Sequence, residues 1–326
     1  MVHCDACGVV AVPEEHLPVT LPEDLFQGHP RYGLSDHPGF RNVSCPRCQR
    51  PARRETDTLD CYFDVVWCFL ACATRLDDDF AFRPSDFSAW MPVDWFHNGL
   101  DSFLYAHLYR FIGRVLFEMG ILSDPEPIRR YYGHDAVLAS GKKMSKHHGN
   151  VVAPSEIIQR MGADVLRLHI LWAANPLKSV EWSDAHVDRA QRLLTTVWDL
   201  IIPHAEMIHR AQEATSSPSM EPRFGALERC LQRTVRRVTA FLEDYRYNAC
   251  LEELHACLNQ LVNFAKTKAD GVDGGEEARA SFARAARTFI LLLTPFAPHL
   301  CEEVWERMGG EGLAATTPWP QVISGK

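Results

Sequence analysis

The feature that most constrains the fold is a set of four cysteines near the start of the chain. Cys4 and Cys7 form one Cys-x-x-Cys pair, and Cys45 and Cys48 form a second. Each pair can offer two thiolates to one tetrahedral metal ion, so two pairs complete a closed four-cysteine site of the kind that holds structural zinc. The spacing therefore predicts that residues 1–55, which are rich in Pro, Gly and Cys, form a small loop-rich module around Zn²⁺.

The cysteine spacing also leaves two alternatives to zinc open. Residues 8–44 separate the pairs, which is longer than the usual ribbon spacing, so an insertion must lie between them. The thiols could be structural without a metal, or one pair could be redox-active, although that would need only one pair in a thioredoxin-like context. If zinc binds, its role would be structural, because four protein thiolates leave no open position for a substrate.

A strongly basic stretch in the middle of the chain suggests an anion. Residues 140–150 read SGKKMSKHHGN, with three lysines, two histidines, no acid and a glycine near each end. A solvated charged turn is one interpretation, and a Walker-type phosphate loop is ruled out because its glycine and lysine spacing is absent. The third is a mobile lysine loop that stabilises negative charge on a transferring phosphoryl group. The residue types alone do not separate the first interpretation from the third.

Net charge limits where nucleic acid could bind. The formal charge is −8, so an RNA contact requires a local basic patch. One such patch falls at i, i+4, i+7 and i+8, which places its members on one helical face. Its residues are Arg229, Arg233, Arg236 and Arg237. The alternative is a solvated face that is partly paired with Glu228 and other acids.

Other sequence signals favour a cytoplasmic protein. The N-terminal residues do not follow the pattern of a signal peptide, and no uncharged apolar run is long enough for a membrane helix. The 11 cysteines are an odd number, and several lie in apolar helical patterns, which suits reduced thiols.

The chain also resembles a known family. KMSKHHGNVVAPSEIIQRMGADVLRLHILWAANPLKSVEWSD, beginning at Lys143, resembles the signature loop of class I aminoacyl-tRNA synthetases. Its Gly-Ala-Asp-x-x-Arg and Glu-Trp-Ser-Asp segments are similar to leucyl-tRNA synthetases. Further matches, from HCDACGVVAVPEEHLPVTLPE to TPFAPHLCEEVWERMG, follow the family's order over nearly the whole chain.

The resemblance implies a fold class of α/β plus all-α. Residues 1–55 would form a zinc-ribbon-like module. Residues 56–184 would form the second half of a Rossmann-like catalytic domain with its lysine loop, and residues 185–326 a helical domain of the anticodon-binding type.

The resemblance also implies a function. The family activates an amino acid with ATP and Mg²⁺ and then passes it to tRNA. Lys143 and Lys146 occupy the catalytic lysine positions of the loop. Asp164 and Arg167 would brace the helix behind it, and Asn150 could tie down backbone groups. The implied ATP-binding residues are Gly141, Lys143, Met144, Ser145, Lys146, Gly149 and Asn150.

The chain departs from the family at several places, and two of them bear directly on function. The His-x-Gly-His motif of the first catalytic half is absent. In the amino-acid pocket Asp101 and Ser102 replace Glu-His, and Tyr105 lies nearby, so the amino acid could be leucine or another.

Three hypotheses about function follow. The first is a synthetase-like chain whose missing half comes from a second chain. The second is a stand-alone paralogue that activates or condenses amino acids in specialised metabolism, and the third is a non-catalytic module that binds tRNA or nucleotide.

Overall fold

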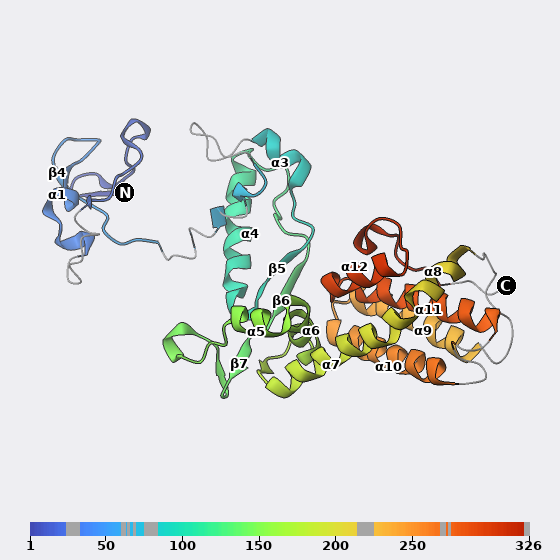
Figure 1. The fold of residues 1–326 in the computed structure, drawn as a ribbon. Coiled ribbons are helices and arrows are strands. Elements are labelled where there is room, and N and C mark those ends of the chain that lie inside the picture. The colour runs from blue at the N-terminus through green and yellow to red at the C-terminus, as the bar shows by residue number, and fades with distance from the viewer. Residues whose placement is uncertain are drawn as a thin grey trace. The chain divides into compact units, whose positions relative to one another are not determined.

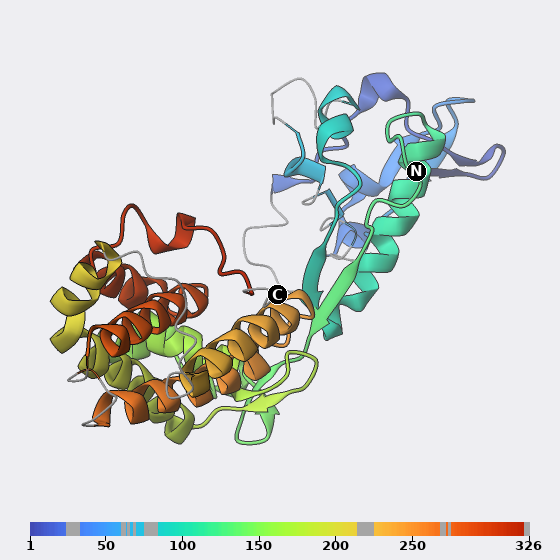
Figure 2. The same ribbon diagram turned by 90° about the vertical axis from the view of Figure 1, so that its right-hand side faces the viewer.

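The computed structural model describes most of the chain, in two compact units. The described residues are 1–23, 33–59, 63, 66–67, 70–74, 84–213, 225–267, 272 and 275–322. One unit comprises residues 1–94 and 104–129, and the other comprises residues 95–103 and 130–326. Figures 1 and 2 show the elements of both units.

The N-terminal module is a small antiparallel sheet with the strand order β2-β1-β4-β3. Because β1 and β4 are central, the sheet brings the two cysteine pairs together from distant parts of the sequence. Its buried apolar side chains among the described residues are few: Val2, Cys4, Val10, Phe40 and Cys45. The elements are β1 (Val2–Cys4), β2 (Gly8–Val10), α1 (Pro38–Arg41), β3 (Asn42–Ser44) and β4 (Pro51–Arg54).

Two helices complete the first unit, α3 (Pro84–Trp90) and α4 (Phe103–Glu118), of which Phe103 belongs to the second unit. Helix α4 buries one side, including Tyr109, Ile112 and Leu116. Gly113 lies on that side against the ring of Pro127, where a larger side chain would collide with the ring.

The strands of the second unit form two small sheets. Strand β5 (Phe96–Gly99) pairs in parallel with β6 (Tyr131–His134). Strand β7 (Val137–Ala139) is central in the other sheet, antiparallel to β8 (Lys142–Lys143) and parallel to β9 (Val180–Glu181). This second sheet holds the basic stretch at a hairpin.

The rest of the second unit is helical. One hydrophobic core extends from Ile157 to Ala314 and is centred on large buried side chains such as Phe282 and Phe289. Helices before residue 185 therefore pack into the same core as those after it. The predicted division of the chain into residues 1–55, 56–184 and 185–326 stays a prediction. The helices are α5 (Pro154–Met161), α6 (Ala163–Ala173), α7 (Asp184–Ile201), α8 (Ala205–Glu213), α9 (Gly225–Glu243), α10 (Tyr247–Lys266), α11 (Glu276–Leu293) and α12 (Pro298–Arg307).

Two side chains of α6 connect it to the region between α11 and α12. Asp164 is buried, accepts a hydrogen bond from the backbone N–H of Leu300 at 2.8 Å, and lies 2.9 Å from Nδ1 of His299. Arg167 donates to the carbonyl oxygens of Pro295 and Phe296 at 2.9 and 3.3 Å. Asp164 thus binds the first turn of α12, where backbone N–H groups lack helical partners. Both residues brace a helix, as expected from the sequence.

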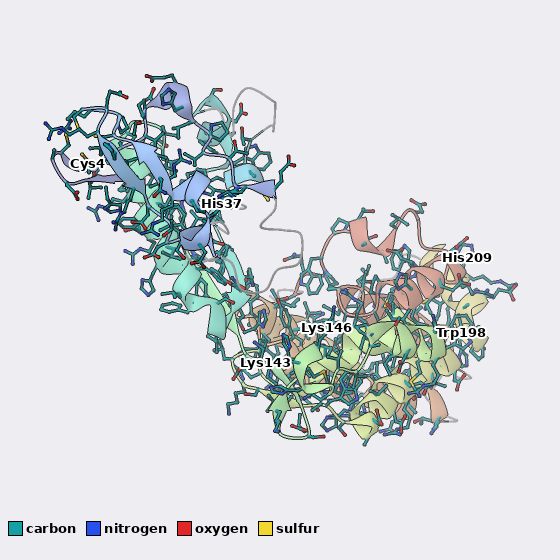
Figure 3. All side chains as sticks on the ribbon, turned by 90° about the vertical axis from the view of Figure 1, so that its left-hand side faces the viewer. Cys4, His37, Lys143, Lys146, Trp198 and His209 are labelled. Atoms are coloured by element: carbon teal, nitrogen blue, oxygen red, sulfur yellow. The ribbon has the colours of Figure 1, made fainter. Side chains whose placement is uncertain are left out.

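Just after α12 ends, the backbone closely approaches a side chain of α8. Gly309 has a φ of 70°, in the left-handed region, and the ring of His209 on α8 lies where a Cβ would be. Only glycine fits both conditions without a shift. His209 is labelled in Figure 3.

The predicted combination of a small cysteine module, a partial α/β region and an all-helical region is confirmed. Among the helices of the described residues, none has both the length and the apolar character needed to span a bilayer.

Candidate functional site

The basic stretch begins with a tight hairpin turn. Leu138 pairs with Lys143 and Ala139 with Lys142, which leaves Ser140 and Gly141 as the two turn residues. Their φ values are 56° and 72°. Positive φ at both central positions is the pattern of a type I′ turn, whose twist matches that of the strands. The glycine expected at the start of the loop is therefore required by the turn.

The second half of the loop is a short 3-10 turn held at both ends. The Ser145 side chain accepts a hydrogen bond from the backbone N–H of His148 at 3.3 Å. Gly149 ends the turn with a φ of 62°, a conformation that favours glycine. The turn places Lys146, His147 and His148 on the exposed surface of the loop.

Asn150 ties the two halves together. Its carbonyl oxygen accepts from the backbone N–H of Ser145 at 2.9 Å. Its amide nitrogen donates to the carbonyl of Ala139 at 3.1 Å and to those of Lys142 and Lys143 at 3.3 Å. One side chain thus binds the hairpin and the turn at once, which is the bracing role expected of Asn150 from the sequence.

The result is a fixed backbone that presents flexible cations. Lys143 and Lys146 are both exposed, and Figure 3 shows them on the loop. An ammonium on a flexible four-carbon stem can follow a phosphate as its charge changes. The arrangement can therefore hold a polyphosphate without covalent chemistry.

A carboxylate lies at the tip of the hairpin. The backbone N–H of Gly141 points at Glu181 of β9, with N···O distances of 3.1 and 3.3 Å to the two carboxylate oxygens. Glu181 begins the Glu-Trp-Ser-Asp segment that carries part of the family resemblance, but the sequence does not predict its contact with Gly141, because the two residues lie far apart along the chain. The contact fixes the position of the turn relative to β9.

A pocket of about 560 Å³ adjoins the loop. Its loop side is formed by Lys143 and Met144, and a second lysine, Lys178, also lines it. Its lining is mainly apolar and includes Val137, Ile170 and Leu171, together with His97, Tyr132, His134, Asp135, Ala136, Ala174, Asn175, Pro176, Val180 and Tyr247.

Three rings that line this pocket, those of His97, Tyr132 and Tyr247, belong to an aromatic cluster that also includes Tyr245. The rings of His97 and Tyr132 lie 5.4 Å apart, and Tyr245 lies 4.7 Å from Tyr132 and 6.0 Å from Tyr247. The Tyr132 hydroxyl donates to the Tyr245 carbonyl at 3.3 Å. This cluster joins β5 and β6 to the start of α10, and no local sequence pattern predicts it. Apolar and aromatic surface beside lysines suits a flat ring that carries an anionic group.

The predicted amino-acid pocket has less support. Asp101 lies in a 3-10 turn before α4, and its side chain is outside the described part of the structure. Tyr105 lies in the first turns of α4, is half-buried, and has interacting neighbours. Both residues therefore stay predictions.

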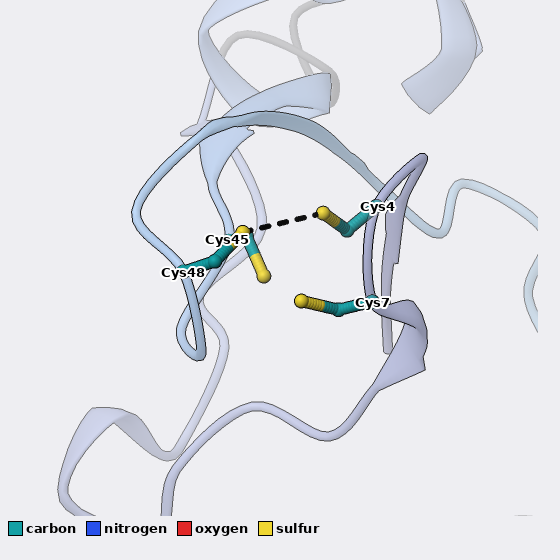
Figure 4. Close-up of side chains that lie close together, drawn as sticks. All are labelled: Cys4, Cys7, Cys45 and Cys48. Atoms are coloured by element: carbon teal, nitrogen blue, oxygen red, sulfur yellow. Dashed lines mark hydrogen bonds between the residues drawn. The ribbon is translucent and has the colours of Figure 1, made fainter.

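The four predicted cysteines converge. The ligand atoms of Cys4, Cys7, Cys45 and Cys48 all lie within 4.8 Å of one another, and the sulfurs of Cys4 and Cys48 are 3.6 Å apart. Figure 4 shows the four side chains pointing toward one point. Sulfurs about 2.3 Å from a tetrahedral zinc would be roughly 3.8 Å apart, so the geometry fits a metal ion of that kind. Zinc itself stays a prediction.

The four arginines on α9 are all exposed. Arg237 pairs with Glu253 at 3.0 Å, and Arg233 donates to the sulfur of Cys230 at 3.6 Å. Arg229 and Arg236 have no carboxylate partner among the residues that the structure describes. The face is therefore partly paired, as a solvated face would be, yet it keeps unpaired cations.

Comparison with known proteins places most of the chain in two family models. Residues 46–183 match "tRNA synthetases class I (I, L, M and V)", and residues 226–325 match "Anticodon-binding domain of tRNA ligase". The first match contains the lysine loop, and the second contains α9 with its arginines.

Curated relatives match over nearly the entire chain. A leucine–tRNA ligase of Petrotoga mobilis is 33% identical over 99% of this chain, which spans 39% of that relative. One of Nitratidesulfovibrio vulgaris is 36% identical over 98% of this chain and is likewise covered over 39% of its length. The chain thus spans about two fifths of the length of these relatives.

Solved structures agree. A LeuRS–tRNA–LeuAMS ternary complex from Agrobacterium radiobacter K84 matches 99% of this chain with a TM-score of 0.76 and 28% identity, over 40% of that chain. A Mycobacterium tuberculosis methionyl-tRNA synthetase shares the fold, with a TM-score of 0.57 and 20% identity. The match includes 75% of this chain and 49% of the synthetase.

Proposed function

Because the chain belongs to the class I tRNA synthetases and is a homologue of the leucine–tRNA ligases, we propose that it takes part in ATP-dependent formation of an aminoacyl-adenylate and its transfer to tRNA. The amino acid is leucine or another one. Lys146 and Lys143 hold the triphosphate of ATP–Mg²⁺ while negative charge shifts during attack on the α-phosphate.

The observation that carries the proposal is the braced lysine loop. Asn150 contacts both halves of the loop, and Gly141 and Gly149 supply the left-handed conformations that its turns need. A backbone fixed in advance orients the lysines at little cost when the anion arrives, which favours electrostatic stabilisation of a transition state. The adjoining pocket offers aromatic surface beside Lys143 for the nucleobase.

The remaining residues have supporting roles in this proposal. Zn²⁺ bound by Cys4, Cys7, Cys45 and Cys48 would stabilise the N-terminal module. The arginines of α9 would contact the RNA backbone. The His-x-Gly-His motif does not occur in these 326 residues, and we propose that a second chain supplies the half of the active site that contains it.

Replacing Lys146 by alanine tests the catalytic role. We expect ATP-dependent pyrophosphate exchange with leucine, measured with the complementing half present, to fall at least about 100-fold, because one preorganised charge contact is lost from the transition state. Lys142→Ala is the matched control: Lys142 lies on the same hairpin, and the family's lysine positions do not include it.

Several outcomes separate the hypotheses. Equal exchange in the Lys146→Ala variant and the unaltered chain contradicts the proposed role. Exchange by this chain alone, in a panel of amino acids, favours a stand-alone paralogue. Salt-dependent tRNA affinity without turnover under any pairing favours a binding module.

A further inference from the structure

Two buried cysteines meet inside the helical domain, away from the candidate ATP and metal sites. Cys230 lies on α9 and Cys257 lies on α10, and the two helices pack side by side (Figure 1). Cys250 of α10 donates to the carbonyl of Val238 of α9, and Arg237 of α9 pairs with Glu253 of α10. This antiparallel register places Cys230 and Cys257 at the same level of the helix pair. Cys257 is fully buried, whereas Cys230 keeps 6% of its surface exposed. Neither thiol has a role in the proposed function.

The surroundings of Cys230 favour its thiolate. The guanidinium of Arg233 donates to its sulfur at 3.6 Å. The hydrogen bond from Cys257, together with the charge of Arg233, lowers the pKa of Cys230 to about 6 despite its burial. Cys250 on the same helix pair is the opposite case, because burial raises its pKa to about 12. A thiolate is the reactive form of cysteine, so Cys230 is activated for reaction with an oxidant, and Cys257 on the adjacent helix offers a second thiol.

We propose that Cys230 and Cys257 are an oxidant-sensitive thiol pair, in which Cys230 reacts with hydrogen peroxide and Cys257 resolves the product to a disulfide between α9 and α10. The Cys230 thiolate attacks one peroxide oxygen, the O–O bond breaks, and hydroxide leaves, which gives a sulfenic acid. The Cys257 thiol loses its proton, its sulfur attacks the sulfenic sulfur, and water leaves. Both sulfurs are oxidised by one electron each, and the peroxide is reduced to two waters.

Oxidation would also change the surface above the pair. Arg233 loses the thiolate that it contacts and is released on the same face as Arg229, Arg236 and Arg237. The covalent link holds α9 to α10 across the Tyr245 turn that follows α9. The pair thus lies directly beneath the basic face of α9.

Peptide mapping of the full chain after peroxide treatment tests the proposal. We expect a Cys230–Cys257 cross-linked peptide that lacks two hydrogens and disappears after reduction. In the Cys257→Ser variant, Cys230 should instead accumulate as a sulfenic acid that a dimedone probe traps. The oxidation rate of Cys230 should rise with pH through about 6, the pKa of that thiol. Arg233→Gln should slow the reaction severalfold and move this rise to higher pH.

Cys250 is the internal control, because it lies in the same core. Its thiol donates to the carbonyl of Val238, and no cation contacts its sulfur among the described residues. Zinc is kept in the buffer, and the peptides of the four N-terminal cysteines are scored separately. Oxidation of Cys250 as fast as Cys230 in a folded chain, judged by circular dichroism, overturns the proposal. So does a persistent Cys230 sulfenic acid without the cross-link in the chain that retains Cys257.

Discussion

At the scale of single residues, His169 is the group whose charge state the fold controls most clearly. It lies on α6 with 2% of its surface exposed, and its ring contacts Trp182 edge-on at 4.4 Å between centroids. Its Nδ1 atom is buried without a hydrogen-bond partner among the described groups. Burial, reinforced by the neighbouring His186, lowers the pKa of His169 to about 4. The folded domain therefore holds this histidine neutral.

This burial predicts a pH dependence of stability. An unfolded histidine has a pKa of about 6.5, so between that pH and about 4 the unfolded chain binds a proton that the folded chain does not. Stability should be highest above pH 6.5 and fall as the pH drops to about 4, by on the order of 3 kcal/mol at most. Urea unfolding of the chain at neutral pH and at about pH 4.5 measures the loss.

The variant His169→Gln removes the titrating ring. It should be less stable than the unaltered chain at neutral pH, because packing against Trp182 is lost, yet it should lose less stability on acidification. His147→Gln, in the exposed loop, is the control and should behave like the unaltered chain. Equal acid-induced losses in all three proteins would show that His169 does not cause the dependence.

At the scale of elements, α9 combines a buried and a cationic face. Leu227, Leu231 and Val238 enter the core, while Arg229 and Arg236 remain on the surface without carboxylate partners in the described part of the chain. Unpaired arginines keep their full attraction for phosphates, whereas Arg237 is already held by Glu253. The two unpaired arginines should therefore contribute most to any RNA contact.

Replacing Arg229 and Arg236 together by glutamine tests this expectation. Affinity for tRNA should fall, and the slope of its logarithm against that of salt concentration should become smaller by about one to two, since each phosphate contact contributes about 0.7 to 0.9. Filter binding over a range of salt concentrations gives both quantities. Arg210→Gln on α8 removes a cation already paired with Glu206 and should leave them unchanged. An unaltered slope in the double variant would exclude α9 as the RNA face.

Some features of these elements can be predicted from the sequence, and others cannot. The lysine loop and the cysteine pairs are predictable because their residues lie close together or repeat a ligand spacing. Partners far apart in the chain are not predictable in this way: Glu181 binds Gly141, and Asp164 binds the start of α12 at Leu300. The aromatic cluster around Tyr132 likewise forms only when β6 meets the start of α10. These contacts depend on tertiary packing, which leaves no periodic or spaced signal.

At the scale of the whole molecule, the N-terminal module and the helical domain differ in how they can be stabilised. The helical domain has a continuous apolar core from Ile157 to Ala314, whereas the described residues of the N-terminal module bury just five apolar side chains, those of Val2, Cys4, Val10, Phe40 and Cys45. So small a core rarely offsets the conformational entropy of a folded chain. A metal ion held by four thiolates would supply the missing free energy, because its binding free energy becomes folding free energy.

Metal removal should therefore unfold one part of the molecule and leave the other intact. After a zinc chelator is added, amide hydrogens in residues 1–54 should exchange much faster, while those of α9 to α11 should keep their protection. Hydrogen exchange followed by mass spectrometry measures both regions in one experiment. Cys45→Ser should reproduce the loss without chelator, and Cys72→Ser, which replaces an exposed cysteine outside the group of four, should not. Unchanged protection of residues 1–54 after chelation would mean that the sheet and its thiols hold the module together without a metal ion.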